Sequence, residues 1–451
     1  MSERFRKILF IFFIGGFIVI TPLVMLYAAG YEFSFEAGKI QKTGMLNIVT
    51  DPKGAKVYLN DKLQSETSFA GLIKKSNLVS TPVKIKNLLP GEYKVRLEAD
   101  GYWTWEKKVY LNPGEAINLD QVILVRKDIP LMATSEPISG VVLSPDKSEY
   151  LCLEKNQCGV FSVSGENLYP LTDKVCSANN LAWSSDGSRL IIGEALYYLN
   201  GGSAQKQNDF PGAIPKAAKL FKFDLKDSSN LYYYNAKNIY RYSLNQAAIE
   251  PIVKTDAAPD DLLVSGNDLD YITRIGNKAF LIAYDLSAKK ETRRIELPYS
   301  DGYQLKDYKN NLLTLLDSRR KILYLIDPAA FTPLKETIQS VNVAYWIDST
   351  SLLYANDFEI WKIDAASGAK ELFTRISTPI KDVIWHPSGD FIIFSTENSI
   401  NLLETSGPEK KIIELVKLDQ VSAPVLDENG EIIYFYGAIR EKKGIYKLRI
   451  R

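Results

Sequence analysis

Short apolar runs separated by polar turns recur from about residue 129 to the end of the chain. The runs are rich in β-branched and aromatic side chains, as in Leu190–Ile192 and Phe391–Phe394. Runs of this kind, bounded by Asp, Asn, Ser and Gly, predict β-strands rather than helices. The best-defined turns are Ser144-Pro145-Asp146-Lys147, Trp183-Ser184-Ser185-Asp186-Gly187, Trp385-His386-Pro387-Ser388-Gly389 and Asp427-Glu428-Asn429-Gly430.

The turns lie about 40 residues apart, which predicts one structural unit repeated along the chain. The polar residue of the turn is Asp146, Asp186, Asp227, Asn267, Asn310, Asp348, Ser388 and Asn429, at spacings of 40, 41, 40, 43, 38, 40 and 41 residues. Units of this length with three or four strands are typical of β-propeller blades. We predict a mainly β chain in which residues 127–451 form a propeller. Eight blades are favoured, with seven as the alternative because the copies between about 215 and 345 are weak.

The last unit lacks an outer strand, and residues 129–133 lie unassigned ahead of the first unit. We expect these residues to pair with the last unit and close the ring, because pairing hides an exposed sheet edge. The Ser-Pro-Asp and Trp-Ser-x-Asp-Gly turns resemble the repeats of TolB-like propellers, which are distant relatives of WD-repeat propellers. The resemblance extends over roughly residues 129–451 and implies the same fold.

An apolar segment precedes all of these units. Ile8 to Ala29 contains no charged residue, and 22 helical residues span the roughly 30 Å core of a bilayer. We therefore predict a transmembrane helix over residues 8–29, through which the chain contacts the lipid bilayer. Residues 1–7 carry three basic side chains and one acidic one, so the positive-inside rule predicts a cytoplasmic tail and extracytoplasmic C-terminal domains. A cleaved signal peptide is the alternative, because Ala28-Ala29-Gly30 is a cluster of small residues.

A second β-rich segment covers residues 44–126, after a linker over residues 30–43. Its turn motifs are Pro52-Lys53-Gly54-Ala55, Thr81-Pro82, Pro90-Gly91-Glu92-Tyr93, Gly101-Tyr102 and Pro113-Gly114-Glu115. In this order they resemble the PEGA domain, a small β-sandwich-like module of bacterial envelope proteins, with Lys53 where the family's name has Glu. The stretch Gln64–Ser80 is longer than the family's usual link, and we interpret it as a surface insertion. The resemblance implies a non-catalytic module that contacts a surface layer, a wall polymer or another protein.

Two aromatic groups are candidate binding residues. Trp103 and Trp105 lie two residues apart and would share one face of a strand, as a packed ridge or as a platform for a carbohydrate or a partner. The densest aromatic cluster is Tyr232, Tyr233, Tyr234, Tyr240 and Tyr242. Its tyrosines either pack within a sheet, or alternate members such as Tyr232, Tyr234, Tyr240 and Tyr242 line a binding face.

Few residues suggest catalysis, and we predict no catalytic residue, metal site or cofactor. His386 is the only histidine, which excludes His-rich zinc sites within this chain. We interpret it as a turn residue, because the equivalent turn at Trp183 has serine. On that interpretation a serine replacement changes stability by less than about 0.5 kcal/mol, as at a surface position. Asp268 and Asp270 flank Leu269 and could bind a cation, but we interpret them as a solvated turn.

The cysteines give one further hypothesis. Cys152 lies in an apolar strand, whereas Cys158 opens a hairpin and Cys176 lies in the link to the next unit. Export from the cytoplasm would permit a Cys158–Cys176 disulfide, and two free thiols are the alternative.

The net charge of +1, without a concentrated basic face, argues against nucleic-acid binding. We therefore expect a membrane-anchored, non-enzymatic interaction or scaffold protein of the cell envelope. Its partner would be another envelope protein or a component of the cell wall or surface layer. The alternative is an envelope hydrolase or lyase that uses acidic and tyrosine side chains of the propeller loops. Converging Asp, Glu, Tyr and Arg side chains with perturbed pKa values would favour the enzyme.

Overall fold

The computed structural model describes residues 3–34, 38–65, 79–134, 138, 140–153, 158–165, 167–171, 181–193, 195–200, 203–207, 214–406 and 410–451. The chain divides into two compact units. Unit 1 is Met1–Asp128 together with Ile450–Arg451, and unit 2 is Ile129–Arg449.

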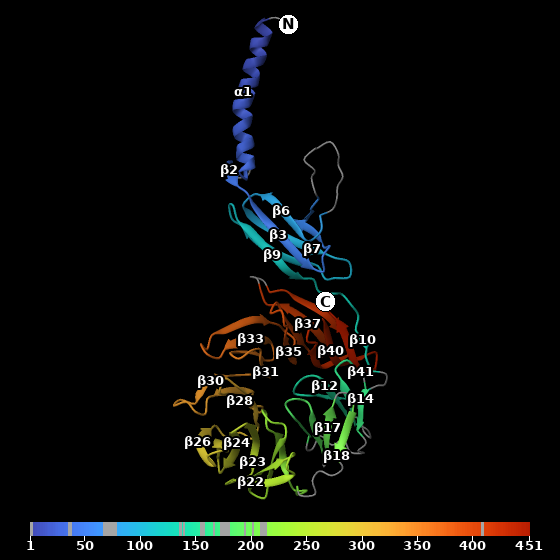
Figure 1. The fold of residues 1–451 in the computed structure, drawn as a ribbon, viewed down its shortest axis with the longest axis vertical. Helices are drawn as coiled ribbons and strands as arrows, with labels where there is room; N and C mark the ends of the chain where they lie inside the picture. The colour runs from blue at the N-terminus through green and yellow to red at the C-terminus, as the bar shows by residue number, and fades with distance from the viewer. Residues whose placement is uncertain are drawn as a thin grey trace. The chain divides into compact units, whose positions relative to one another are not determined.

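Unit 1 begins with helix α1 (Glu3–Ala28), drawn in dark blue in Figure 1. Its segment Leu9–Ala28 has a mean hydropathy of 2.7 and is long and apolar enough to cross a membrane. Large side chains such as Phe12 and Phe17 are exposed along it. A membrane span and a signal sequence both fit this length and composition. A hairpin of β1 (Tyr31–Ser34) and β2 (Lys39–Lys42) follows the helix.

The remainder of unit 1 is a sandwich of two sheets with one shared core. One sheet has the order β6 (Val83–Leu88), β3 (Gly44–Asp51), β9 (Ala116–Ile123), with β3 and β9 parallel. The other has the order β5 (Lys62–Leu63), β4 (Lys56–Leu59), β7 (Gly91–Glu98), β8 (Trp105–Leu111). Alternate residues of the strands point inward, so Leu46, Ile48, Val57, Val95 and Leu97 are fully buried between the sheets. The small β-sandwich expected for this segment is confirmed.

Unit 2 is a β-propeller. Its described residues form eight four-stranded antiparallel sheets, and in Figure 1 these follow one another from green through yellow to red. The first four sheets contain β11 (Val141–Leu143), β12 (Glu149–Leu153), β13 (Cys158–Ser162), β14 (Asn167–Leu171); β15 (Leu181–Trp183), β16 (Arg189–Ile192), β17 (Ala195–Asn200), β18 (Ser203–Gln207); β19 (Lys219–Phe223), β20 (Asn230–Asn235), β21 (Asn238–Ser243), β22 (Ala248–Lys254); and β23 (Pro259–Ser265), β24 (Asp268–Ile275), β25 (Lys278–Asp285), β26 (Lys290–Leu297).

The remaining four sheets have the same meander order, except that the last one borrows a strand. They contain β27 (Tyr303–Lys309), β28 (Leu312–Asp317), β29 (Ile322–Ile326), β30 (Leu334–Ile338); β31 (Val343–Trp346), β32 (Ser351–Ala355), β33 (Glu359–Asp364), β34 (Lys370–Arg375); β35 (Asp382–Trp385), β36 (Phe391–Ser395), β37 (Ser399–Glu404), β38 (Ile412–Lys417); and β39 (Gln420–Leu426), β40 (Ile432–Ile439), β41 (Lys442–Arg449), β10 (Leu131–Met132).

Strand β10 closes the ring. Leu131 pairs with Lys447 and Met132 with Tyr446, so the first strand of unit 2 is the outer strand of its last sheet. On the inner side, β39 of the last sheet lies beside β11 of the first. The expected pairing of residues 129–133 with the last unit is therefore confirmed.

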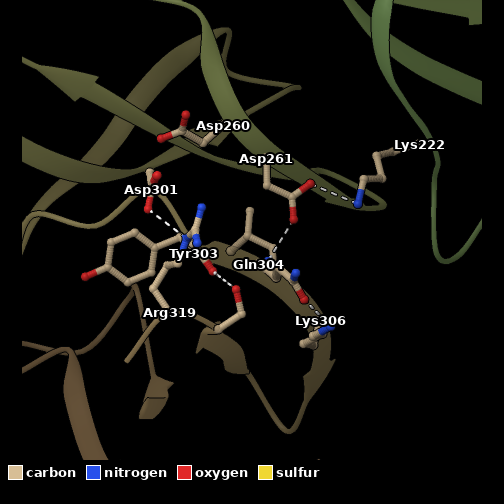
Figure 2. Close-up of a pocket in the computed structure, with 11 residues that line it drawn as sticks. Lys222, Asp260, Asp261, Asp301, Tyr303, Gln304, Lys306 and Arg319 are labelled. Atoms are coloured by element: carbon tan, nitrogen blue, oxygen red, sulfur yellow. Dashed lines mark hydrogen bonds and ion pairs between the residues drawn. The ribbon is translucent and has the colours of Figure 1, made fainter. Parts of the chain in front are cut away.

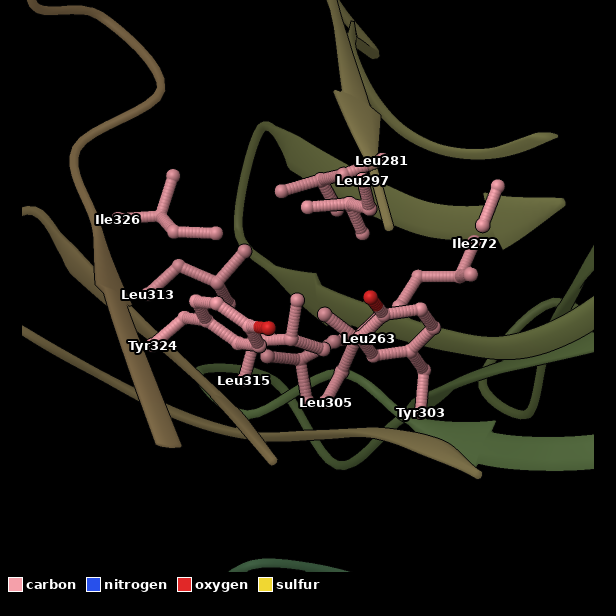
Figure 3. Close-up of a cluster of buried hydrophobic side chains, with 11 residues drawn as sticks. Leu263, Ile272, Leu281, Leu297, Tyr303, Leu305, Leu313, Leu315, Tyr324 and Ile326 are labelled. Atoms are coloured by element: carbon pink, nitrogen blue, oxygen red, sulfur yellow. The ribbon is translucent and has the colours of Figure 1, made fainter. Parts of the chain in front are cut away.

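Neighbouring sheets pack face to face through apolar clusters. Figure 3 shows the cluster between the β23–β26 sheet and the β27–β30 sheet. Leu263, Ile272 and Leu281 of the first sheet meet Leu313 and Leu315 of the second, and all five are buried. Each buried leucine contributes about 1.5–3 kcal/mol relative to exposure, so this cluster fixes the spacing of the two sheets that form the sites described below.

The polar turns that produce the sequence repeat also form hydrogen bonds between neighbouring sheets. Their hydrogen bonds run from Ser228 Oγ to Asp186 Oδ2 (2.8 Å), from the backbone N–H of Gly266 to Asp224 Oδ1 (2.9 Å) and from Asn310 Nδ2 to the carbonyl of Ser349 (2.5 Å). The two partners of each bond belong to equivalent turns of neighbouring sheets. The repeat in the sequence is thus a repeat of contacts between sheets as well as of hairpin turns.

Candidate functional site

Two hollows involve the β23–β26 and β27–β30 sheets. The first, the Asp261 hollow, has a volume of about 540 Å³. It is lined by Lys222, Asp260, Asp261, Asp301, Gly302, Tyr303, Gln304, Leu305, Lys306, Ser318 and Arg319. These residues come mainly from β19, β23 and β27, the first strands of three successive sheets (Figure 2).

The charged groups of the Asp261 hollow pair with one another. Asp261 is buried, and its carboxylate contacts Lys222 Nζ at 2.9 Å and accepts the N–H of Leu305 at 2.9 Å. Arg319 contacts Asp301 at 3.2 Å. Burial lowers the pKa of Lys306, an effect that Asp261 opposes and Lys222 reinforces. Because these opposite charges already satisfy each other, the arrangement holds three sheets together and leaves little for a ligand to neutralise.

The second hollow, the Asp270 hollow, has a volume of about 800 Å³. It is lined by Lys226, Ser265, Asp268, Leu269, Asp270, Ala283, Tyr284, Asp285, Thr292, Arg293, Tyr308, Asn310, Asn311, Asp327, Pro328 and Ala329. Strand β24 supplies Asp270 and β27 supplies Tyr308, so the two sheets joined by the cluster of Figure 3 also form this wall.

Asp270 is the distinctive group of this hollow. Asp270 is only 1% exposed, and its Oδ2 accepts a hydrogen bond from the hydroxyl of Tyr308 at 2.6 Å. Its Oδ1 is buried and has no hydrogen-bond partner. Burial raises the pKa of Asp270 to about 7; the Tyr308 hydrogen bond opposes this rise and the charge of Asp268 adds to it. A carboxyl group with this pKa changes charge near neutral pH.

The interpretation of Asp268 and Asp270 as a solvated turn is wrong for Asp270. Asp268 is exposed at the start of β24, but Asp270 follows Leu269 into the part of the strand that is buried on both faces. The apolar run Tyr271-Ile272 directly after it was the sequence signal for burial. No local pattern indicated that Tyr308 would contact Asp270, because Tyr308 lies in the next unit of the repeat.

Three other charged groups of the Asp270 hollow are engaged with backbone groups. Arg293 donates to the carbonyls of Ala330 (2.7 Å) and Phe331 (2.9 Å). Asp285 and Asp327 accept backbone N–H groups of the turns that follow them. Within the described part of the chain, no three His, Cys, Asp or Glu side chains gather as metal ligands.

The two tryptophans do not form a ridge on one strand. Strand β8 begins at Trp105, so Trp103 lies outside it and the assumption of a shared strand face is wrong. Trp105 packs against the sandwich core. Trp103 is half-buried, has its ring 4.8 Å from Lys127 Nζ, and has a buried Nε1 without a hydrogen-bond partner. A binding role for either residue stays a prediction.

The tyrosine cluster lies between propeller sheets. Tyr232 is buried in the cluster shared with the β23–β26 sheet, with Tyr234 packed beside it. Tyr242 is buried on the other side, where Tyr240 stacks on Tyr233 with ring centroids 5.4 Å apart. Burial of Tyr232 and Tyr242 agrees with sheet packing, and a binding role for the partly exposed Tyr234 and Tyr240 stays a prediction.

Of the cysteines, Cys152 is buried in β12. Cys176 lies outside the described residues, and the side chain of Cys158 is not described either. The predicted Cys158–Cys176 disulfide therefore stays a prediction.

His386 lies in a turn, as expected, but not at the surface. It is 2% exposed and packs edge-to-face on Phe391, with ring centroids 5.6 Å apart. Its Nδ1 accepts the N–H of Ser388 (3.1 Å), so Nε2 carries the proton and donates to the carbonyl of Gly430 (2.9 Å). Gly430 belongs to the equivalent turn of the next sheet, which makes His386 part of the inter-sheet contacts.

This burial changes the expected result of a serine replacement. His386→Ser should lower the free energy of unfolding by about 1–3 kcal/mol, because it removes the hydrogen bond to Gly430 and leaves a cavity beside Phe391. Denaturant unfolding at pH 7 measures the change, and Pro387→Ala, at an exposed position of the same turn, is the matched control. A loss no larger than that of the control would restore the surface interpretation.

Residues 72–125 match the PEGA domain family. The chain contains a PEGA domain. The resemblance drawn from the Pro90-Gly91-Glu92-Tyr93 and Pro113-Gly114-Glu115 motifs is therefore confirmed, and the PEGA domain coincides with strands of the sandwich from β6 to β9.

Solved structures similar to the chain include propellers. The Dos1 propeller has 11% identity and a TM-score of 0.49, over 71% of this chain and 95% of that one. The C-terminal WD40 domain of Sif2 has 14% identity and a TM-score of 0.46, over 72% and 97%. A structure described as the eukaryotic initiation factor has 12% identity and a TM-score of 0.47, over 72% and 94%.

A comparison with the sequences of curated proteins gives no match. The resemblance to TolB-like repeats is not tested by any of these findings and stays a prediction. A PEGA domain followed by a propeller in one chain indicates a protein-interaction scaffold.

Proposed function

We propose that this chain is a membrane-anchored interaction protein of the bacterial cell envelope. In this proposal α1 holds the PEGA domain and the propeller on the outer side of the membrane, and both domains bind rather than catalyse. The observation that carries the proposal is the order of the parts: a basic tail, an apolar segment Leu9–Ala28 and a PEGA domain. The resemblance to the PEGA domain implies an envelope module, and the positive-inside rule gives the orientation.

The charge of the chain and its envelope location also suggest the class of partner. A scaffold with near-balanced charge does not attract nucleic acid, and the expected partner is another envelope protein or a wall or surface-layer component. The propeller offers recesses such as the Asp270 hollow, where side chains of a partner enter.

Topology is the first test. Protease added to intact cells or spheroplasts that express the chain should degrade the propeller, and a cytoplasmic protein in the same cells should survive as the control. Digestion of the propeller only after lysis would overturn the orientation. Mass spectrometry of the N-terminus separates an anchor from a signal peptide, because cleavage near Ala28–Gly30 would remove the apolar helix.

One observation favours the alternative of an envelope hydrolase or lyase. Asp270 combines a pKa of about 7 with a hollow and a tyrosine, which are features of a general acid. Against this, Tyr308 is held by Asp270 and burial raises its own pKa, so it is a poor base. Turnover of wall polysaccharide or peptide that Asp270→Asn abolishes would establish the enzyme; binding without turnover supports the scaffold.

A further inference from the structure

We propose that the Asp270 hollow binds a primary ammonium group, as carried by a lysine side chain of a partner protein. This inference deepens the binding role proposed for the propeller and rests on it. It starts from a single unsatisfied atom, the buried Oδ1 of Asp270, a residue that lines a hollow of about 800 Å³.

An acceptor left without a donor is costly in a folded protein. A buried polar atom without a partner destabilises the fold, and it does so more strongly when it is charged. Asp270 is 1% exposed, yet only its Oδ2 is satisfied, by Tyr308. Tyr308 fixes the carboxyl group in place and leaves the other oxygen for a donor that comes from outside the chain.

The geometry selects an ammonium over other cations. A guanidinium binds a carboxylate best through both oxygens, but Oδ2 of Asp270 is already occupied. A metal ion needs several ligands, and no set of three is present among the described residues. A single N–H donor from an –NH₃⁺ group needs only one oxygen, which is what Asp270 offers.

The rest of the hollow matches a lysine side chain. Leu269, Ala283, Tyr284 and Pro328 provide apolar surface along which a four-carbon stem can lie. The hollow also holds four carboxyl groups against two basic side chains, so its charge favours a cation. Of the basic side chains, Arg293 is engaged with backbone carbonyls.

Ligand binding should be linked to proton release. Burial raises the pKa of Asp270 to about 7, so part of the population carries a proton at neutral pH. An incoming ammonium favours the ionised carboxylate and displaces that proton. The charged and titratable groups that line the hollow with Asp270 are Asp268 on its own strand, and Lys226, Asp285, Arg293, Tyr308 and Asp327 on the other elements. Of these, Tyr308 lowers the pKa of Asp270 and Asp268 raises it.

Calorimetric titration of the full-length chain in detergent tests the proposal. The probes are the tripeptide acetyl-Gly-Lys-Gly-amide, its Nε-acetylated form, its arginine counterpart and n-butylammonium chloride. We expect the lysine peptide to bind at pH 8, the arginine peptide to bind more weakly, and the Nε-acetylated peptide not to bind. At pH 7 the heat of binding should vary with the ionisation enthalpy of the buffer, because binding releases a proton.

Two variants separate the site from the fold. Asp270→Asn should weaken lysine-peptide binding about tenfold or more and abolish the buffer dependence. Asp301→Asn, which changes an exposed carboxylate of the Asp261 hollow, is the matched control and should bind like the wild type. Asp270→Asn removes a buried charge, so circular dichroism should show a folded variant that melts no lower than the wild type at pH 8.

Each outcome has a defined meaning. The ammonium site is overturned if neither the lysine peptide nor n-butylammonium binds. It is also overturned if the lysine peptide binds equally well to the wild type and to Asp270→Asn. Binding of n-butylammonium as tight as that of the lysine peptide keeps the ammonium site but assigns it to a free amine instead of a protein. The protease test of topology is independent, so a failed titration leaves the envelope scaffold standing and a failed topology leaves the ammonium site standing.

Discussion

Replacing Asp317 with alanine should lower the free energy of unfolding by about 3 kcal/mol, because the variant loses a buried carboxylate that accepts several hydrogen bonds. Asp317 ends β28 and is fully buried. Its carboxylate accepts Ser300 Oγ (2.9 Å), the N–H groups of Arg319 and Arg320 (3.1 Å each) and Arg320 Nε (2.6 Å). The alanine variant leaves all four donors without this acceptor. Denaturant unfolding at pH 7 measures the loss.

The control for Asp317 is Asp364→Ala. Asp364 also ends a strand, β33, and accepts the N–H (2.7 Å) and hydroxyl (2.6 Å) of Ser367, but it is not buried. Because water can replace the lost acceptor there, we expect a much smaller loss. Equal losses at both positions would show that the turn, and not the burial of the Asp317 carboxylate, determines the effect.

The effect at Asp317 should depend on pH. Burial alone would raise the pKa of Asp317, but hydrogen bonds from Ser300 and Arg320 outweigh burial and hold the pKa below its ordinary value. A carboxyl group with a lowered pKa stabilises the fold above the pKa of the unfolded chain, about 4, and this contribution is lost as the pH falls through its folded value. The difference between wild type and variant should therefore shrink below about pH 4. A constant difference down to pH 2 would assign the effect to packing.

Gly444→Val should detach the closing strand and cost about 3 kcal/mol. A Cβ atom at Gly444 would lie 2.5 Å from Met132 Cε and 2.7 Å from Thr134 Oγ1, so the added side chain takes the place of side chains through which the closing segment packs on β41. The amides of β41 should then exchange with solvent faster, and the exposed edge should promote association of the protein. Hydrogen exchange followed by mass spectrometry measures both the size and the location of the change.

Lys443→Val is the matched control for Gly444→Val. Lys443 precedes Gly444 on the same strand and is exposed, so valine there adds the same side chain without reaching β10. We expect wild-type exchange in β41 for this control. Wild-type exchange in the Gly444→Val variant as well would mean that β10 contributes nothing to ring closure.

The sequence predicted the propeller because its turns carry the repeat. The sequence repeat is weakest between residues 215 and 345, where the sheets are nevertheless regular. At one of these turns Asn310 and Asn311 both have positive φ, 46° and 64°, which is the conformation of a two-residue type I′ hairpin turn. This turn chemistry replaces the Trp-Ser-x-Asp-Gly pattern, so the sequence similarity fades while the hairpin remains.

The candidate site was not predictable in the same way. Asp270 and Tyr308 are 38 positions apart and meet only because their two sheets are neighbours. His386 is buried for a similar reason, since its acceptor is the carbonyl of Gly430 on the following sheet. A local pattern reports turns and strands, but it does not report which turn residue faces the next sheet. In both cases, the sequence analysis therefore missed the burial of a polar side chain against the neighbouring sheet.

The position of β10 has a mechanical consequence. The chain enters the propeller through this strand of only two residues, and it is covalently linked on its N-terminal side to the PEGA domain and α1. In a chain anchored by α1, any pulling force between the membrane and a partner held by the propeller reaches β10 before it reaches another sheet. Two residues of pairing resist such a force far less than a strand of eight, such as β41. Tension would therefore open the ring at its closing sheet first, while the other sheets stay folded.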